Sequence, residues 1–455
     1  MTFDQIASLA VLVGVVALMI HGRMRADVVA LLGAAVLLVL GVVRPVEVQG
    51  AFASPAVIAL AGLFVIAYAI ELSGLLGLMI RQATRLSARV GALGIWLVIG
   101  LCGSVGGFLN NTPVVVLAAP VIRDVAHSLG LSAKRFLMPL SHVTVMGGLL
   151  TLIGTSTNLL VNDMARNAGQ PVFGLFEITP VGLVIASVGG LWLYFVGARQ
   201  LERTAAEDEA RGPALAERER PAPPEDALLI GEARNLPDGS GDARLGDVAL
   251  YKAADRPFRL RPALVSFSVF VAVIVAAAMG WAPIAAAAFA GAVSLILLKV
   301  ITPDEAYAGL RPEILLLIAG MVVIGTAMEL SGLAKAAADQ LIVVLLPLGP
   351  LAALAVLYGV TLFATELLSN ATVAVLMTPI AVAVAESLGV DPRPFLVAVM
   401  MAASAAFATP FGYQTNVLVF NMGRYRYMDF VRVGLPLNLV TWAAAMAAIP
   451  VFFPF

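Results

Sequence analysis

Two landmark segments of this chain occur twice, and the copies keep the same spacing along the sequence. Residues 69–75, reading Ala-Ile-Glu-Leu-Ser-Gly-Leu, return at 327–333 as Ala-Met-Glu-Leu-Ser-Gly-Leu. The Thr-Asn pair at 157–158 returns at 415–416 with the same offset of 258 residues. A shared offset indicates one ancestral unit used twice. The chain is therefore expected to fold as two halves with one architecture.

Long apolar runs decide the environment of both halves. The chain is 60% hydrophobic and 13% charged, and its apolar runs reach the length of about 20 residues that crosses a bilayer. These features predict an integral membrane protein. The formal net charge is −1 with no long basic block, which argues against nucleic acid as a partner. The single cysteine, Cys102, lies in an apolar run and is interpreted as a small packing residue.

Each half contains five predicted crossings and one extra apolar segment. The extra segments, 91–127 and 349–387, have polar centres and are interpreted as re-entrant helical hairpins. Irregular backbone at membrane depth is tolerated where protein or water satisfies its polar groups. The predicted crossings are 5–20, 27–43, 55–73, the broken helix 133–167 and 176–198, then 263–279, 281–298, 312–331, the broken helix 394–422 and 433–453.

An odd number of crossings per half predicts that the second half is inverted relative to the first. With the central loop in the cytoplasm, all but four of the 28 Lys and Arg residues fall on the inner side. The four outer residues are Arg44, Arg166, Lys335 and Arg393. The charge pattern therefore predicts a multi-pass protein of the cytoplasmic membrane with both termini outside.

The predicted domains follow from this reading. Residues 1–199 form the first inverted repeat and residues 262–455 the second. Residues 200–261 are rich in Pro, Glu, Asp and Arg and are interpreted as a cytoplasmic linker. Within the linker, 226–252 shows short strand-like alternation, and a vestigial small domain remains an alternative there.

Each predicted hairpin carries an Asn-centred motif, and the two copies align at an offset of 259 residues. Phe-Leu-Asn-Asn-Thr-Pro ends the first half of hairpin 91–127, and Leu-Leu-Ser-Asn-Ala-Thr lies in 349–387. A helix starting at each motif would present free backbone amides, which favour an anion. Ligands of inverted-repeat transporters bind near the midplane against such helix ends. The predicted substrate-binding residues are Asn110, Asn111, Thr112, Thr157, Asn158, Ser369, Asn370, Thr372, Thr415 and Asn416.

No Lys or Arg lies within these motifs, so another positive charge is needed to hold an anion. One helix end contributes about 0.3–1 kcal/mol, whereas a cation about 4 Å from an anion contributes roughly 4 kcal/mol at an effective dielectric near 20. Sodium is therefore expected to bind first and complete the anion site, with no organic cofactor. The predicted sodium ligands are oxygens of Gly106, Asn111, Gly154, Thr365, Asn370 and Ala408.

Other readings of the polar positions stay open. Polar patches in membrane helices also act as bonds between helices without any ligand. Glu366 is costly in lipid and is a candidate for a coupling proton, which would make the protein proton-coupled or a sodium/proton antiporter. A channel, or a membrane anchor with a sensing loop, belongs to a different class, although an anchor needs no polar midplane.

The motifs together resemble the divalent anion/sodium symporters, carriers of sulfate and dicarboxylates in the ion transporter superfamily. The resemblance rests on Phe-Leu-Asn-Asn-Thr-Pro, Ile-Gly-Thr-Ser-Thr-Asn, Glu-Leu-Leu-Ser-Asn-Ala-Thr and Ala-Thr-Pro-Phe-Gly-Tyr-Gln-Thr-Asn. It covers nearly the whole chain outside the linker. It implies a homodimer whose scaffold domains hold elevator-type transport domains, with no enzymatic chemistry.

In the family, Ser-Asn-Thr motifs at both hairpin tips bind substrate and sodium. By position these correspond to 110–112 and 369–371 here. Two departures are present: Asn110 replaces the serine, and Ala371 lacks the hydroxyl that would contact a carboxylate. The resemblance thus implies sodium-coupled symport of a small divalent anion, and the departures leave sulfate or export of another oxyanion open beside a dicarboxylate.

Overall fold

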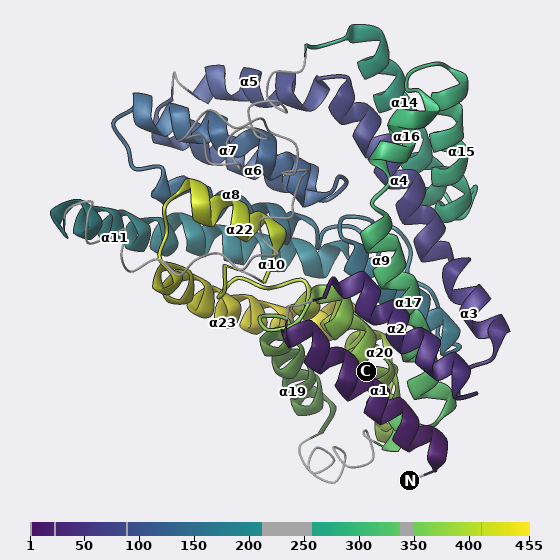
Figure 1. Cartoon of the computed structure of the whole chain (residues 1–455). Helices are drawn as coiled ribbons and strands as arrows, with labels where there is room; N and C mark the ends of the chain where they lie inside the picture. The colour runs from purple at the N-terminus through teal and green to yellow at the C-terminus, as the bar shows by residue number, and fades with distance from the viewer. Residues whose placement is uncertain (1, 22–23, 88–89, 212–256, 337–348, 411) are drawn as a thin grey trace.

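The structure is a computed structural model, and every regular element in the residues it describes is helical (Figure 1). It describes residues 2–21, 24–87, 90–211, 257–336, 349–410 and 412–455. The helices of the first half are α1 (Phe3–His21), α2 (Ala26–Val39), α3 (Pro45–Phe52), α4 (Pro55–Leu72), α5 (Leu75–Ser87), α6 (Ala92–Gly106), α7 (Asn111–Ser128), α8 (Lys134–Gly147), α9 (Ser156–Asn167), α10 (Thr179–Trp192), the π-helical turn η1 (Leu193–Gly197) and α11 (Ala198–Arg211).

The second half repeats this order of helices. Both α4 and α17 begin with proline, and the short helices α3 and α16 precede them in the same position. The helices are α14 (Leu260–Ala278), α15 (Ile284–Leu297), α16 (Pro303–Gly309), α17 (Pro312–Leu330), α19 (Gly349–Ala364), α20 (Asn370–Leu388), α21 (Arg393–Ala403), α22 (Gln414–Met422) and α23 (Tyr427–Phe452).

Six helical stretches of the described residues are long and apolar enough to cross a membrane; five coincide with predicted crossings, and the sixth, Asn370–Leu388, lies in the predicted hairpin 349–387. The other predicted crossings are shorter apolar helices or are broken into two. The first broken helix consists of α8 and α9, and the second of α21 and α22. The six long stretches are Pro45–Leu72, Thr179–Ala206, Leu260–Ala278, Pro312–Leu330, Asn370–Leu388 and Tyr427–Phe452.

The helices fall into two groups that lie side by side (Figure 1). The first group contains the first four helices of each half, α1–α4 and α14–α17, which pack mainly on one another. Its largest contacts each join a helix of one half to a helix of the other half. Helix α2 packs against α17, and α4 packs against α15. The second group contains α6–α11 and α19–α23, in which α7 packs against α22 and α20 against α9. Helices α4, α5 and α17 contact both groups.

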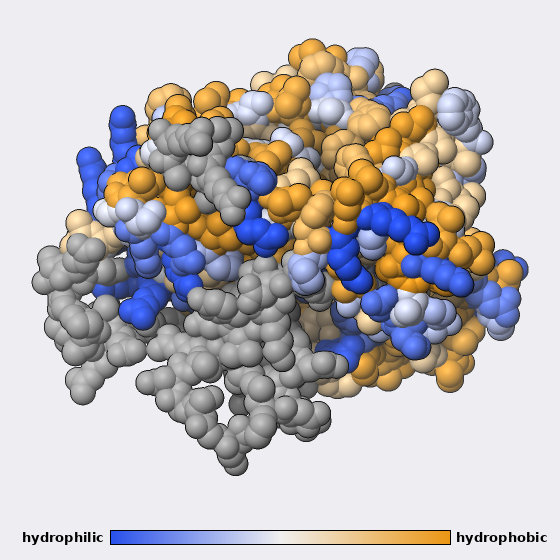
Figure 2. All heavy atoms as spheres, turned by 90° about the horizontal axis from the view of Figure 1, so that it is seen from above, coloured by the Kyte–Doolittle hydropathy of each residue, from blue (hydrophilic) through white to orange (hydrophobic). Residues whose placement is uncertain are grey.

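Glycines allow the closest helix approaches. A Cβ on Gly62 of α4 would lie 2.6 Å from the Ala288 carbonyl of α15, and one on Gly320 of α17 would lie 2.8 Å from the carbonyl carbon of Ala30 in α2. Small residues permit such backbone contact where lipid provides little hydrophobic driving force between helices. The face seen in Figure 2 carries many hydrophobic side chains, with hydrophilic side chains gathered in patches among them.

The predicted linker, 200–261, is shorter than expected in the structure. Helix α11 continues to Arg211 and packs against α8, with Leu201 fully buried, and α14 already begins at Leu260. The charged composition of α11 resembles a solvated segment, but its apolar positions recur on one helical face and bury against α8. The possible small domain at 226–252 lies outside the described residues.

Candidate substrate-binding site

The two predicted hairpins form as helix–turn–helix units whose second helices begin at the Asn motifs. Asn110 is the N-cap of α7, and its side chain accepts a hydrogen bond from the Thr112 amide at 3.2 Å. Ser369 is the N-cap of α20 and accepts from the Thr372 amide at 3.2 Å. Asn and Ser are preferred at this position because their side chains satisfy an amide left free at a helix start. The motif sequences therefore fix where both helices begin.

The two helix breaks are closed by equivalent asparagines. The Asn158 amide donates to the carbonyls of Gly148 and Thr151, at 3.3 and 3.1 Å. Asn416 donates in the same way to the carbonyls at 406 and 409, at 2.9 and 3.2 Å. Both side chains are fully buried. These asparagines hold the ends of the interrupted helices in place, and buried carbonyls without such donors would be costly.

Glu366 also stabilises the break between α21 and α22 through hydrogen bonds. Its carboxylate accepts hydrogen bonds from the backbone amides of Phe407, Ala408 and Thr409, at 2.8–2.9 Å. The Thr409 hydroxyl donates to it at 2.8 Å, and the Asn438 side chain of α23 donates at 2.7 Å. Together these groups join the Glu366 carboxylate to three successive backbone amides of the break and to α23.

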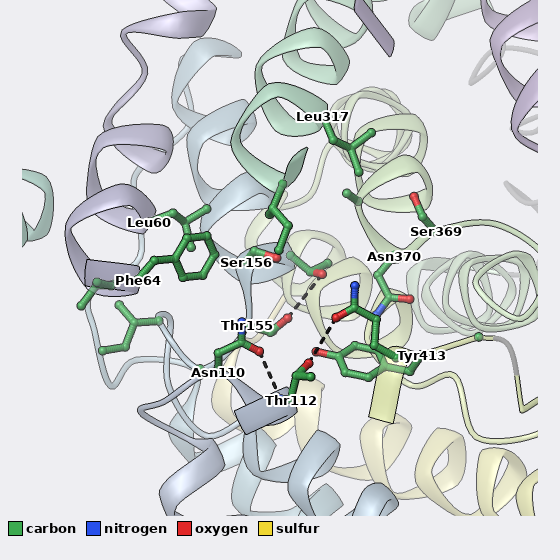
Figure 3. Close-up of a pocket in the computed structure, with 18 of the residues that line it drawn as sticks. Leu60, Phe64, Asn110, Thr112, Thr155, Ser156, Leu317, Ser369, Asn370 and Tyr413 are labelled. Carbon is green, nitrogen blue, oxygen red and sulfur yellow. Dashed lines mark hydrogen bonds between the residues drawn. The ribbon is translucent and has the colours of Figure 1, made fainter. Parts of the chain in front are cut away.

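Both hairpin tips and both breaks open into one cavity of about 390 Å³ (Figure 3). Leu60 and Phe64 of α4, with Leu317 of α17, form its apolar wall. The opposite side is polar. The polar residues lining it are Asn110, Thr112, Thr155, Ser156, Thr157, Glu366, Ser369, Asn370, Tyr413 and Gln414.

Half of the predicted substrate-binding residues line this cavity. They are Asn110, Thr112, Thr157, Ser369 and Asn370. The other five, Asn111, Asn158, Thr372, Thr415 and Asn416, are buried behind it with protein partners.

Two of the residues behind the cavity show what those partners are. The Thr415 hydroxyl bonds Ser141 of α8 at 2.7 Å. Thr372 bonds Ser369 at 2.6 Å and lies 3.2 Å from the sulfur of Met19. Their side chains support the cavity from behind rather than face it.

Asn111 lies where the first set of predicted sodium ligands converges. Its side-chain amide has one atom 3.3 Å from the Gly106 carbonyl oxygen and 3.2 Å from the Thr144 carbonyl oxygen, and the other atom 3.2 Å from the Tyr413 hydroxyl. With the nitrogen toward the carbonyls, all three contacts are hydrogen bonds. With the oxygen toward them, three oxygens face one another, which a cation stabilises. With its nitrogen toward the carbonyls, Asn111 joins the end of α6, helix α8 and the second break through hydrogen bonds.

Gly154 completes the surroundings of Asn111. A Cβ on Gly148 would lie 3.2 Å from the Asn111 amide nitrogen and 3.2 Å from the Gly154 carbonyl oxygen, so both groups are neighbours of Gly148. A Cβ on Gly106 would lie 3.0 Å from the Asn111 side-chain oxygen. Glycines at these positions leave room beside the oxygens that a side chain would fill.

The second predicted ligand set is only partly assembled. The Thr365 hydroxyl donates to the Asn370 side-chain oxygen at 2.8 Å and contacts the Ala403 carbonyl at 2.7 Å. The Asn370 amide nitrogen has no partner within the described chain. The backbone amide of Ala408, whose carbonyl oxygen is a predicted ligand, donates to Glu366 at 2.8 Å.

Tyr413 and Gln414 are site residues that the sequence analysis did not single out. Gln414 accepts a hydrogen bond from Thr112 at 3.2 Å, and Tyr413 contacts Asn111. Both contacts join the second-half break to the first-half hairpin, over about 300 residues of sequence. The available signal was their position directly before the repeated Thr-Asn pair, where Thr155 and Ser156 stand in the first half and also line the cavity.

A helical membrane chain with interrupted helices around one polar cavity is a membrane transporter. The chain belongs to the citrate transporter family, whose profile matches residues 16–392 and 367–455. The family confirms the assignment made from the motifs, since relatives with matching segments are named sodium/sulfate cotransporters.

Three relatives illustrate the range of similarity. An uncharacterized transporter of Synechocystis sp. is 25% identical, with 95% of this chain and 94% of that protein covered. An uncharacterized transporter of Escherichia coli, YfbS, is 23% identical over 98% of this chain and 99% of that protein. Sodium/sulfate cotransporter 1 of Chlamydomonas reinhardtii is 32% identical over 32% of this chain and 17% of that protein.

Two solved structures share the fold. The YdaH transporter of Alcanivorax borkumensis matches with a TM-score of 0.57 at 14% identity, covering 89% of this chain and 86% of that chain. MtrF of Neisseria gonorrhoeae, described with a class of antimetabolite efflux pumps, matches with a TM-score of 0.57 at 13% identity, covering 92% and 84%.

Proposed function

We propose that this protein is a secondary active transporter that couples sodium entry to symport of a small divalent anion, sulfate or a dicarboxylate, across the cytoplasmic membrane. The observation that carries the proposal is the cavity at which two hairpin tips and two helix breaks meet. Its described lining contains no Lys or Arg, so an anion there needs a cation that the lining does not supply. The relatives named sodium/sulfate cotransporters favour sodium and sulfate.

The convergence of oxygens at Asn111 supports sodium as that cation. Sodium would turn the Asn111 side-chain oxygen toward the carbonyls of Gly106 and Thr144, and its charge would then act on an anion in the adjacent cavity. Binding of the anion would follow binding of sodium. We assign the second sodium position to Thr365 and Asn370, whose oxygens lie 2.8 Å apart.

Contacts between helices of the first half and helices of the second half support an inverted repeat. Helix α2 meets α17 while α4 meets α15, as expected for two copies related by a two-fold axis. The division into two helix groups supports an elevator-type mechanism. In this mechanism the second group, α6–α11 and α19–α23, moves against the first group, α1–α4 and α14–α17, which acts as the scaffold. A homodimer, implied by the family resemblance, would hold the scaffold groups in place.

The alternative of proton coupling through Glu366 is less well supported. Its carboxylate accepts hydrogen bonds from three backbone amides of a helix break and from Asn438, which supports a structural role for Glu366. Export of another oxyanion uses the same cavity, and the direction of transport follows from the gradients applied.

The proposal is tested by uptake into proteoliposomes. Purified protein should accumulate labelled sulfate or succinate under an inward sodium gradient, and Asn111→Ala should abolish this uptake. Asn167→Ala, which removes an exposed amide at the end of α9, is the matched control and should keep full uptake.

Folding of the Asn111→Ala protein is checked by its melting temperature with and without sodium. Wild-type protein should be stabilised by sodium and the variant should not. Full sodium-dependent uptake by Asn111→Ala, or accumulation driven equally by protons alone, would refute the proposal.

A further inference from the structure

We propose that Gln414, the first residue of α22, binds the anion directly through its side-chain NH₂ group, and that Thr112 is a positioning residue that fixes this amide. The pair makes the site favour an oxyanion without a proton, such as sulfate, over one that carries a proton, such as hydrogen phosphate. The inference rests on the proposed function and adds the residues that decide which oxyanions bind.

The side-chain amide of Gln414 is held at its oxygen and free at its nitrogen. Gln414 lines the cavity, and its side-chain oxygen accepts a hydrogen bond from the Thr112 hydroxyl at 3.2 Å. Its nitrogen donates to no residue that the structure describes. The two N–H bonds of this group are therefore available to a ligand, and a ligand that meets them must accept hydrogen bonds.

Two other amides of the cavity lining follow the same pattern. The Asn110 side-chain oxygen accepts from the Thr112 backbone amide at 3.2 Å (Figure 3), and the Asn370 oxygen accepts from the Thr365 hydroxyl at 2.8 Å. The nitrogens of Asn110 and Asn370 have no acceptor within the described parts of the chain. Such groups are satisfied by an anion whose oxygens all accept, whereas an O–H of the ligand would meet another donor.

Glu366 carries a carboxylate in the same lining, and its negative charge repels every anion. Its two oxygens accept five hydrogen bonds from the second break and from α23, which uses the roughly four lone-pair sites of a carboxylate. The carboxylate therefore has no free position for the O–H of hydrogen phosphate. Sulfate and hydrogen phosphate carry the same double charge, so Glu366 and sodium act equally on both, and the proton makes the difference.

The duplication shows that the fold does not require this pair of residues. By the repeat offsets, Gln414 corresponds to Ser156 in the first half. Thr112 corresponds to Ala371, which has no hydroxyl, so the corresponding hydrogen bond cannot form. Helix α9 nevertheless begins at Ser156, and both Ser156 and Ala371 line the cavity. A polar pair at this position is thus a feature of the cavity and not a condition for closing the break.

The test measures the KM of sulfate uptake in proteoliposomes at saturating sodium. Gln414→Leu keeps the approximate size of the side chain but removes the donor, and it should raise KM about tenfold or more. Gln49→Leu changes an exposed glutamine of α3 that does not line the cavity. This matched control should leave KM unchanged.

The positioning role of Thr112 is tested with a double-mutant cycle. Thr112→Val removes the hydroxyl and keeps the shape, and it should raise KM by about three- to tenfold, whereas Thr112→Ser should restore the wild-type value. In a Gln414→Leu background, Thr112→Val should have no further effect, because Thr112 acts through Gln414. A further loss in the double variant would show that Thr112 contacts the anion itself and would overturn its positioning role.

Selectivity is measured by competition with labelled sulfate at mildly alkaline pH, where phosphate is mainly doubly charged hydrogen phosphate. In wild type, unlabelled selenate should compete about tenfold more strongly than phosphate. This ratio should fall in Gln414→Glu, whose added carboxylate can accept the O–H of hydrogen phosphate. Equal competition by the two anions in wild type would overturn the preference for an anion without a proton.

A measurement of binding without transport shows that the variants are folded. Sulfate should raise the melting temperature of wild type and of Gln49→Leu by the same amount, and that of Gln414→Leu by less.

The outcomes separate this inference from the function on which it rests. Sodium-driven sulfate uptake by wild type, with KM and stabilisation by sulfate unchanged in Gln414→Leu, would overturn the role of Gln414 and leave the symporter intact. Sodium-driven uptake of succinate but not of sulfate would do the same. Absence of any sodium-driven anion uptake by wild type would refute both.

Discussion

Asparagine serves three different purposes in this site, although its side chain is chemically the same each time. Asn110 caps a helix, Asn158 and Asn416 close the helix breaks, and Asn111 lies among carbonyl oxygens. The neighbouring groups differ: Asn110 accepts from a backbone amide, Asn158 and Asn416 donate to carbonyls of the breaks, and Asn111 lies between two carbonyls and the Tyr413 hydroxyl. Residue type alone therefore does not identify a ligand.

At the residue scale, Glu366→Gln is expected to destabilise the protein and remove transport at every pH. The glutamine can present one acceptor oxygen, but its NH₂ group would face donors that the carboxylate satisfies. We expect a loss of about 2–4 kcal/mol, measured by chemical denaturation in detergent. Glu202→Gln, at an exposed ion pair with Arg135, is the control and should cost less than about 1 kcal/mol.

A different result would restore the proton role of Glu366. If Glu366→Gln retained full stability and sodium-driven uptake while losing proton-coupled uptake, the carboxylate would be a proton carrier and not a fastening of the break.

At the element scale, contacts between helices of the second group depend on how closely their backbones approach each other. A Cβ on Gly147 of α8 would lie 1.9 Å from the Gly103 carbonyl oxygen of α6, which no side-chain movement relieves. A Cβ on Gly103 would lie 2.7 Å from a methyl carbon of Val143. The first hairpin is thus held directly against the first broken helix, so that the two can move as one body.

Gly147→Ala should separate α6 from α8 and lower stability by about 1–3 kcal/mol or more, because overpacking forces the backbones apart. Sodium-dependent uptake should fall with it. Gly100→Ala, in α6 with open space around its Cα, is the matched control and should be neutral or slightly stabilising. Equal melting temperatures for the two variants would contradict this packing.

The hairpins and breaks were predictable from sequence because their signals are local. Glycines interrupt helices, Asn110 and Ser369 favour helix starts, and the duplication marks both copies. The rotation of each helix was not predictable in the same way. Whether Thr372 or Ser369 faces the cavity depends on how α20 packs against α9, α17 and α21, which are distant in sequence.

At the scale of the whole molecule, the predicted topology places Arg44 outside and Lys299 inside the cell. Both side chains are exposed, and neither lines the cavity. In a Cys102→Ala background, Arg44→Cys should react with a membrane-impermeant maleimide added to intact cells. Lys299→Cys should react only after the membrane is opened. The positive-inside distribution of charge is the reason for the expected difference.

Labelling of both cysteines in intact cells would contradict the inverted arrangement of the halves. Labelling of Lys299→Cys alone would show the whole topology reversed, with the fold unchanged. Retained sodium-dependent uptake by each variant is the control for correct folding.

The sequence by itself determined that the chain is a helical membrane protein, that it is built from one unit used twice, where its helices break, and to which family it belongs. These properties follow from apolar runs, helix-breaking residues and repeated motifs, all of which act over a few neighbouring residues. Only the tertiary structure decided that the Glu366 carboxylate holds the break between α21 and α22 and that Tyr413 contacts Asn111. These contacts join residues from about 40 to 300 positions apart, and they depend on the packing and rotation of whole helices, which no local pattern specifies.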